Sequence, residues 1–458
     1  MWSFARTAAI LFAVCPALLH AQSDAELRTQ VAELTAMVKQ LQTRVAQLET
    51  RLPAAAPAPV AAAAPAASVP PVQTAAAPSP QPSAEDSWHG TTFNFLLDTY
   101  YGYNFNAPIG RVNLLRAYDV SSNNFSLNQA AMVIEHAPDP ADGRRFGARL
   151  DLQYGQATQT LQGNPANEPR PDIYRTVFQA YGTYVAPLGQ GLTIDFGKWA
   201  SSIGIEGNYT KDDINYSRSF WFNYLPFYHM GMRANFKVND LLSLNYWVTN
   251  GTQQTEAFKG FKDQLVGFNL QPHKNVNWTF NYYLGQEHPD VQYFLYGNAP
   301  AGAPTNQGVP FEPISPAATG KLHILDTYAN WQATPKLTLA LEGDWVIERL
   351  YTWSPPSHTA GGAFYLRYQL APKFALGARA EYLTDRGGLF SGTTQALKET
   401  TFTTEYQVGD GFLLRGEWRR DFSNQPYFYT DTLGILNRQQ NTATLGLIWW
   451  SGGKKGAW

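Results

Sequence analysis

The strongest constraint on the fold of this chain is a period-two alternation of apolar and polar side chains that begins near Trp88. The alternation comes in segments of about 10 to 12 residues, the length of a tilted strand that crosses a bilayer. The connections between the segments alternate too, so that a short turn follows each long loop. Antiparallel strands joined in this way gather the short turns at one rim and the long loops at the other, as in outer-membrane β-barrels.

The alternation is clear over 337–347, where Leu341 and Trp345 face one side and Glu342 and Asp344 the other. A soluble antiparallel sheet alternates in the same way, so the connections carry more weight. Along the whole segment, short turns such as 187–190 and 372–373 alternate with long loops, with one predicted strand between each turn and the next loop. We therefore predict an all-β fold, a transmembrane antiparallel up-and-down β-barrel of about 16 strands. The predicted strands are 92–104, 125–136, 145–155, 173–185, 191–200, 229–238, 241–250, 264–271, 276–286, 321–333, 337–348, 361–371, 374–384, 397–407, 411–420 and 441–450.

The composition agrees with a membrane barrel. Aromatic residues make up 14% of the chain and charged residues only 15%. A soluble protein with so many aromatic residues needs a very large core, whereas lipid covers the apolar face of a membrane barrel. Trp199, Trp345 and Tyr382 near strand ends are expected to form part of an aromatic belt at the long-loop rim. The net charge of −2 gives no sign of a nucleic-acid partner.

Three segments precede the predicted barrel at 88–458. Residues 1–21 have the basic start and short apolar run of a signal peptide with cleavage after Ala21. Cys15 lacks a small residue just before it, which disfavours lipidation, and it is the only cysteine. Residues 53–86 are rich in Ala and Pro and predict a semi-rigid linker.

Residues 24–52 carry apolar side chains at alternating spacings of four and three. This heptad seam, with Val at a and Leu at d, predicts a periplasmic coiled coil through which the protein self-associates. The alternative is a single amphipathic helix that rests on the barrel. The apolar positions are Leu27, Val31, Leu34, Val38, Leu41, Val45, Leu48 and Leu52.

The long connection 201–228 is the candidate constriction loop, because sixteen strands leave an aqueous channel unless a segment folds inside. Its mixed charges and aromatic side chains can narrow the pore or pack the loop onto the rim. The candidate residues are Glu206, Lys211, Asp212, Asp213, Arg218 and Trp221. If Asp212 and Asp213 line a constriction, neutralising both is expected to shift the reversal potential toward anions.

Strand parity places charged side chains of both signs in the lumen, so no strong ion preference follows. Such charges either pair as salt bridges that stiffen the wall or form a field that steers solutes. The candidate lumen charges are Arg145, Arg149, Arg233, Glu342, Asp344, Arg367, Arg379, Glu381, Arg415, Glu417 and Arg419.

The competing class is a barrel hydrolase, which needs a nucleophile and a base within hydrogen-bond reach, usually oriented by a third group. None of the histidines is expected to lie mid-strand beside a serine, and His229 begins a strand. No metalloprotease, nucleophile-elbow or phosphate-loop motif occurs. We therefore predict no enzyme activity, no cofactor and no metal.

The segments Phe196–Trp199, Asn215–Arg218 and Leu225–Arg233, together with Leu447–Trp450 and the tail to Trp458, resemble a family of outer-membrane β-barrel porins called OmpL-like. The resemblance covers most of 90–458 and is most specific in its central motif. It implies a pore in the outer membrane and supplies no catalytic residues.

The favoured function is passive diffusion of small hydrophilic solutes through a water-filled barrel in the outer-membrane bilayer. The alternative is a structural anchor or adhesin with a plugged barrel. A phosphate-selective porin is less favoured, because no lysine-rich ladder faces the lumen.

Overall fold

The computed structural model describes residue 39 and residues 90–162, 168, 171–257, 259–294, 309–454 and 456–458. The predicted signal peptide, the linker and, apart from Lys39, the coiled coil lie outside these residues.

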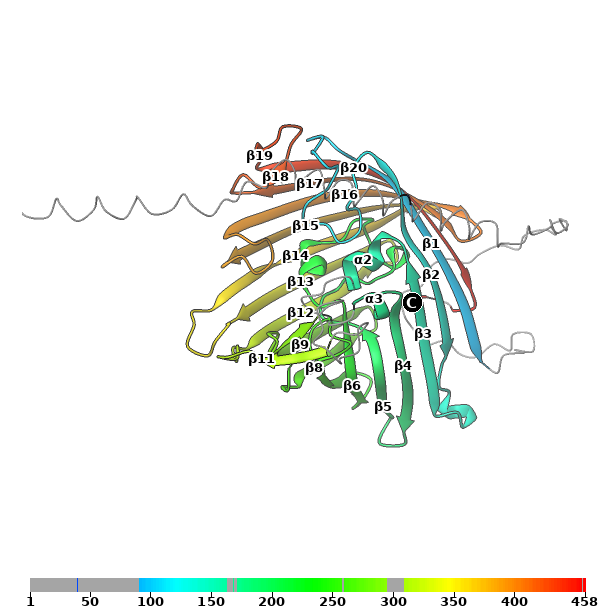
Figure 1. Cartoon of the computed structure of the whole chain (residues 1–458). Coiled ribbons are helices and arrows are strands. Elements are labelled where there is room, and N and C mark those ends of the chain that lie inside the picture. The colour runs from blue at the N-terminus through cyan, green and yellow to red at the C-terminus, as the bar shows by residue number, and fades with distance from the viewer. Residues whose placement is uncertain are drawn as a thin grey trace, which may run out of the picture. The chain divides into compact units, whose positions relative to one another are not determined.

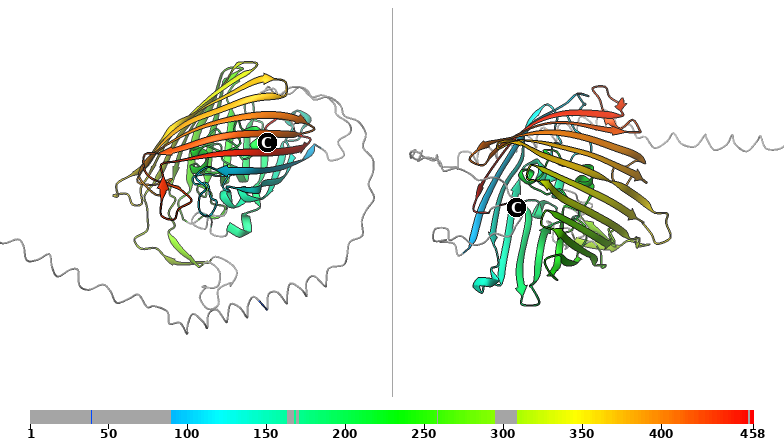
Figure 2. Two further views of the ribbon diagram at one scale, coloured as in Figure 1. Left: turned by 90° about the horizontal axis from the view of Figure 1, so that it is seen from above. Right: turned by 180° about the vertical axis from the view of Figure 1, so that it is seen from behind.

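The described chain forms a closed antiparallel barrel in which neighbours in sequence are neighbours in the sheet, and β20 closes the ring against β1 (Figures 1 and 2). The sixteen-strand prediction is confirmed. The strands of the barrel are β1 (Thr91–Asn104), β2 (Asn124–His136), β3 (Phe146–Tyr154), β4 (Val177–Ala186), β5 (Leu192–Ala200), β6 (Tyr228–Lys237), β7 (Leu242–Thr249), β8 (Asp263–His273), β9 (Val276–Gly285), β12 (Leu322–Thr334), β13 (Leu337–Glu348), β14 (Ser357–Ala371), β15 (Phe374–Arg386), β16 (Gln395–Gly409), β17 (Phe412–Ser423) and β20 (Gln439–Gly452).

The largest differences from the predicted strand bounds lie at the long-loop ends. β14 begins at Ser357, not at 361, and β4 begins at Val177, not at 173. The short helix α3 (Pro171–Tyr174) takes the residues before β4. Proline in the first helical position, followed by an acidic Asp172, favours a helical turn there over a strand.

Small elements occupy the connections between the strands. Helix α2 (Gln156–Gln162) packs on β2 and β3, and α4 (Phe220–Tyr224) packs on β15. The other elements are the 3-10 turns η1 (Pro140–Asp142) and η2 (Thr210–Asp212) and the strand pairs β10 (Val291–Phe294) with β11 (Val309–Pro313) and β18 (Phe428–Tyr429) with β19 (Leu436–Asn437). Among the described residues, no helix has the length and apolar character that crossing a bilayer requires.

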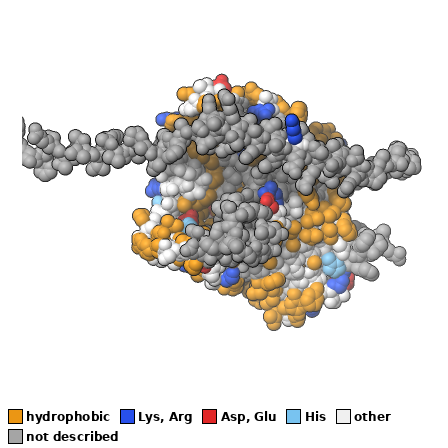
Figure 3. Space-filling model, in the orientation of Figure 1, with side chains coloured by type: hydrophobic (Ala, Val, Ile, Leu, Met, Phe, Trp, Pro, Cys, Tyr) orange, Lys and Arg blue, Asp and Glu red, His pale blue; other side chains and the backbone are white. Residues whose placement is uncertain are grey.

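The burial of side chains is reversed relative to a soluble sheet. Leu341 is 60% exposed and Trp345 is 49% exposed, whereas Glu342 and Asp344, on the other face of the same strand, are buried. Figure 3 shows hydrophobic side chains over much of the visible outer face. An apolar outer surface around a polar interior is the pattern of a membrane barrel.

Trp345 and Tyr382 are exposed, as a belt requires, whereas the prediction is wrong for Trp199. Trp199 is fully buried, with its ring 6.0 Å from that of Trp247. It shares the strand parity of Asp195, which pairs with Arg233 on the inner face, so alternation turns it inward.

Candidate functional site

The connection between β5 and β6, residues 201–227 (the β5–β6 loop), is hydrogen-bonded to inward-facing side chains of the barrel wall. Acidic side chains hold its backbone N–H groups. The Gly204 N–H donates to Asp326 at 3.0 Å and the Ile205 N–H to Glu342 at 2.9 Å. A carboxylate that accepts backbone N–H groups makes a strong, charge-assisted hydrogen bond.

The same pattern recurs further along the loop. Glu417 accepts the N–H groups of Tyr216 and Ser217 at 2.6 and 3.0 Å. Glu381 accepts the N–H of Phe220, the first residue of α4, at 2.6 Å. These contacts fix the loop to β15 and β17.

Arginines on the same side of the wall hold the loop's carbonyl groups. Arg415 donates to the carbonyl oxygens of Thr210 at 2.6 Å and Asn215 at 3.1 Å. Arg379 donates to the carbonyl of Ser217 at 2.7 Å, and Arg419 donates to that of the next residue, Arg218. The planar guanidinium, with five donors, can bind several carbonyl oxygens at once.

Side chains on β1 and β2 also hold the loop. Asp98 on β1 accepts the hydroxyl of Thr210 at 2.6 Å and that of Tyr216 at 2.8 Å. Gln129 on β2 donates to the Asn208 carbonyl at 3.1 Å. β2 and β12 are the second and tenth strands in the ring of sixteen, and so lie on opposite sides. The loop therefore bridges the lumen.

Close approach of the loop to the wall depends on two glycines. A Cβ added to Gly446 on β20 would lie 2.4 Å from the Tyr216 ring, and one on Gly377 would lie 2.9 Å from the Ile214 carbonyl oxygen. Any side chain at these positions has to displace the loop.

Inside the loop, charged residues pair with one another and with the wall. Asp213 accepts the Gly207 N–H at 2.8 Å and lies 3.0 Å from Arg218, whose guanidinium is fully buried. Burial raises the pKa of the Asp213 carboxyl to about 7, although the charge of Arg218 acts in the opposite direction. Glu206 pairs with Arg379 at 2.7 Å.

The remaining candidates in the loop have different surroundings. Lys211 pairs with Asp212 at 2.7 Å and lies 4.5 Å from the ring centroid of Trp458. Trp221 is fully buried in the hydrophobic cluster that also holds Trp199 and Trp247. Trp221 therefore anchors the loop by packing.

Other predicted lumen charges form pairs along the wall. Arg149 pairs with Asp151 at 2.8 Å, Arg233 with Asp195 at 2.7 Å and Arg367 with Glu405 at 2.6 Å. Arg145 lies just before β3, at the short-turn end, where it donates to the carbonyl of Val185 at 3.1 Å.

Sequence reasoning missed part of the site on β1 to β3. Asp98 and Gln129 are fully buried, and neither was a candidate. The exposed Phe95 and Leu97 fix the outward parity of β1, and Asp98 has the opposite parity, so its inward position could have been found. Tyr118, from the loop after β1, donates to Asn208 at 2.5 Å, and nothing in the sequence indicates this contact.

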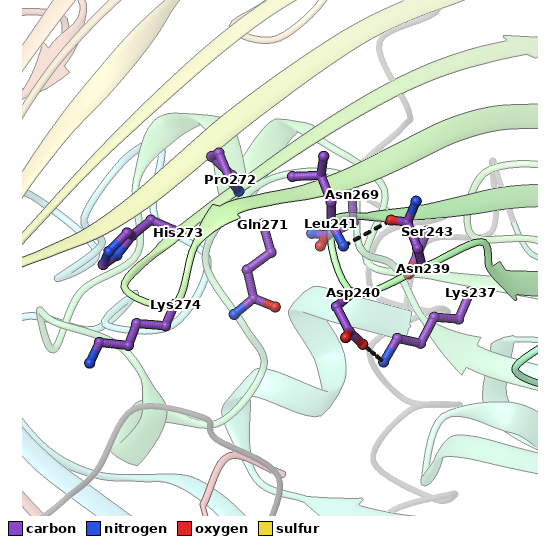
Figure 4. Close-up of a pocket in the computed structure, with 10 residues that line it drawn as sticks. All are labelled: Lys237, Asn239, Asp240, Leu241, Ser243, Asn269, Gln271, Pro272, His273 and Lys274. Atoms are coloured by element: carbon purple, nitrogen blue, oxygen red, sulfur yellow. Dashed lines mark hydrogen bonds and ion pairs between the residues drawn. The ribbon is translucent and has the colours of Figure 1, made fainter.

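Two cavities open around the loop and the wall. One, of about 160 Å³, is lined by Phe178, Gln179 and Ala200 of the wall together with Glu206 and Asn208 of the loop. The other, of about 460 Å³, lies at the short turns of β6–β7 and β8–β9 (Figure 4). Its lining is polar, and Figure 4 shows Lys237 paired with Asp240.

One serine–histidine contact occurs where β5 ends and β6 begins. Ser201 Oγ lies 3.1 Å from His229 Nε2, so a serine does lie beside a histidine. The other ring nitrogen faces the carbonyl oxygen of Gly251 at 3.3 Å. No carboxylate occupies the orienting position among the described contacts of His229.

A closed antiparallel barrel with an apolar exterior, a polar interior and a loop across the lumen defines a membrane pore of the porin class. Residues 90–449 match the family model "Putative beta-barrel porin-2, OmpL-like". The chain belongs to this family of outer-membrane porins and is an outer-membrane barrel.

Several solved structures are similar to this chain at low sequence identity. The anion-selective porin from Comamonas acidovorans is 7% identical, with a TM-score of 0.51 over 79% of this chain and 99% of its own. The channel DcaP of Acinetobacter baumannii is 8% identical, with a TM-score of 0.49 over 80% and 99%. OprB of Pseudomonas putida is 12% identical, with a TM-score of 0.48 over 80% and 94%. No curated protein matches the sequence.

Proposed function

We propose that this porin lets small hydrophilic solutes diffuse through a lumen narrowed by the β5–β6 loop. The observation that carries the proposal is that buried charges on opposite sides of the wall, Glu342 on β13 and Asp151 on β3, hold the loop. A segment fixed in this way narrows a channel without needing a partner or an energy source.

The inner face of the wall on β6 to β9 is suited to the passage of neutral polar solutes. Its inner face carries amide side chains that bond one another, as Asn235 does to Asn245 at 2.6 Å and Asn269 to Asn277 at 2.8 Å. Amides both donate and accept hydrogen bonds, so they can replace the water around sugars or amino acids. The basic side chains on this part of the wall, Arg233 and Lys237, are paired with acids, so they favour neither phosphate nor another ion strongly.

A planar-bilayer recording of the purified protein, together with liposome swelling in sugars, amino acids and phosphate, tests the proposal. We expect stepwise openings and swelling with sugars and amino acids, without a preference for phosphate. A silent bilayer and liposomes that do not swell would favour the plugged anchor or adhesin, which the many bonds to the loop also permit. We propose no catalytic role for Ser201 and His229.

We also propose that residues 24–52 form a periplasmic coiled coil through which the chains associate. The unbroken heptad seam supports this proposal. Deleting 24–52 is expected to lower the mass of the detergent-solubilised assembly measured by light scattering, while the barrel still inserts. An unchanged mass would favour a single helix that rests on the barrel.

Asp213 is expected to make ion selectivity depend on pH. With a pKa of about 7, its carboxyl is mostly neutral at pH 6 and mostly charged at pH 8. A negative charge in a poorly hydrated site attracts cations, so the reversal potential should move toward cations as the pH rises. Asp213→Asn should remove this change and Asp212→Asn should keep it. A wild-type reversal potential that is the same at both pH values would contradict the prediction.

A further inference from the structure

Three acidic side chains meet on the inner face of β12 and β13, where the β5–β6 loop begins. They are Asp326, Glu342 and Asp344, and one carboxylate oxygen from each lies within 4.8 Å of the others. Asp326 and Asp344 are direct partners across the two strands, and Glu342 precedes Asp344 by two residues on the same face. On the other side, the partner of Asp344 is Gly361 on β14, which has no side chain to fill the space.

Two of the three carboxylates are hydrogen-bonded only to neutral groups. Asp326 accepts the Gly204 N–H at 3.0 Å and the Asn281 amide at 2.7 Å. Glu342 accepts the Ile205 N–H and the Tyr365 hydroxyl, both at 2.9 Å. Within the described part of the chain, none of the three acids forms an ion pair with a basic side chain.

Asp344 is the unexplained member of the cluster. It is 5% exposed, and no N–H or hydroxyl donor among the described residues bonds to either of its carboxylate oxygens, whose polar neighbour is the carboxyl group of Asp326. Other buried acids of the wall have a basic partner or a hydrogen-bond donor. Glu399, for example, pairs with Arg379 at 3.0 Å, and Asp98 accepts three hydrogen bonds.

Three buried carboxylates without a counter-charge are costly, because each loses hydration and like charges directly across a strand pair repel. A hard divalent cation removes both costs, since it binds carboxylate oxygens directly. Calcium takes oxygens at about 2.3–2.6 Å, so two ligands on opposite sides of the ion are about 5 Å apart. The spacing of these oxygens fits that range.

We propose that Asp326, Glu342 and Asp344 form a binding site for a divalent cation of the calcium type, with both free oxygens of Asp344 available as ligands. The site goes beyond the proposed diffusion function and does not depend on it. Because Asp326 and Glu342 also hold Gly204 and Ile205, a bound ion stiffens the start of the β5–β6 loop.

The test is metal binding by the purified, EDTA-treated protein in detergent. Terbium, which replaces calcium and luminesces when a nearby tyrosine such as Tyr365 absorbs light, is titrated and then displaced with Ca²⁺ or Mg²⁺. We expect one terbium site per chain, displaced more readily by Ca²⁺ than by Mg²⁺. Calcium should also raise the thermal unfolding temperature of the wild-type protein.

The decisive variant is Asp344→Asn, which removes a ligand without taking an acceptor from any N–H or hydroxyl donor of the described residues. It should weaken terbium and calcium binding at least tenfold and abolish the calcium-dependent rise in unfolding temperature. Asp195→Asn, a change at a buried wall acid outside the cluster that pairs with Arg233 and not with the loop, is the matched control and should bind like the wild type. Glu342→Gln, which keeps an oxygen acceptor, serves as a second ligand variant if Asp344→Asn does not fold.

Absence of a terbium or calcium site in the wild-type protein would overturn the proposal, and the cluster would then hold a proton between its carboxyl groups. Equal affinities for wild-type, Asp344→Asn and Asp195→Asn would overturn it as well, because the ions would then bind elsewhere.

Discussion

Excising residues 201–227 should raise the single-channel conductance about twofold or more, because the β5–β6 loop crosses a lumen that sixteen strands otherwise leave open. The barrel tolerates the excision, since Ala200 and Tyr228 are direct partners at the ends of β5 and β6. An Asn-Gly turn between them preserves the register of the two strands. The wall charges that held the loop become hydrated. Planar-bilayer recordings of the excised and wild-type proteins measure the change.

The matched control shortens another long loop at the same rim. Glu348 and Ser357 are also direct partners, and residues 349–356 between them make no described hydrogen bond to the inner wall. Replacing 349–356 by the same turn should leave the conductance unchanged. If both excisions change conductance equally, or neither does, the β5–β6 loop does not form the constriction.

The strands were predictable because each carries its own signal. Alternation within a single strand predicts which side chains face lipid and which face the lumen, as it does for Phe95, Leu97 and Asp98 of β1. Short turns fix the register between neighbours, so local rules suffice to order the whole ring. Trp199 shows the limit, because its position near a strand end suggested the membrane interface while its parity turned it inward.

The path of the loop was not predictable in the same way. Glu417 holds the backbone N–H groups of Tyr216 and Ser217, and backbone groups leave no trace in the sequence. The two segments are also about two hundred residues apart, with no local rule to join them. Parity placed Glu417 in the lumen but left open whether it stiffened the wall or steered solutes. It binds the loop.

The resemblance to the porin family gains a physical reason from these contacts. Asn215, Ser217 and Arg218 of its central motif are fully buried; Asn215 and Ser217 bond to the wall, and Arg218 bonds to the loop itself. The side chain of Asn215 donates to Thr403 at 2.8 Å, and Arg218 donates to the carbonyl of Tyr216 at 2.9 Å. The residues of this motif determine how the loop is held. The motif therefore indicates a pore of this family but not which solute passes through it.

Arg379 is expected to be the most important single side chain for holding the loop. It contacts Glu206 and Ser217 of the loop, and it lies 3.0 Å from Glu399 and 3.7 Å from Glu381 on the wall. Arg379→Ala removes the cation that these acids share. When the site stays buried, this loss lowers the free energy of unfolding by about 3–5 kcal/mol. Release of the loop into water relieves that cost. The variant should therefore show larger, noisier openings and a lower thermal unfolding temperature.

Two further variants, one at Arg367 and one at Arg379 itself, separate this role from a general effect of charge. Arg367→Ala removes an arginine that is only partly buried and whose partner Glu405 keeps Arg415, so its conductance and unfolding temperature should stay near those of the wild type. Arg379→Lys keeps the charge but loses the planar fork of donors, and should fall between wild type and Arg379→Ala. It also keeps the prediction testable if the alanine variant does not fold. Identical recordings from Arg379→Ala, Arg367→Ala and wild type would show that the loop is held without this arginine.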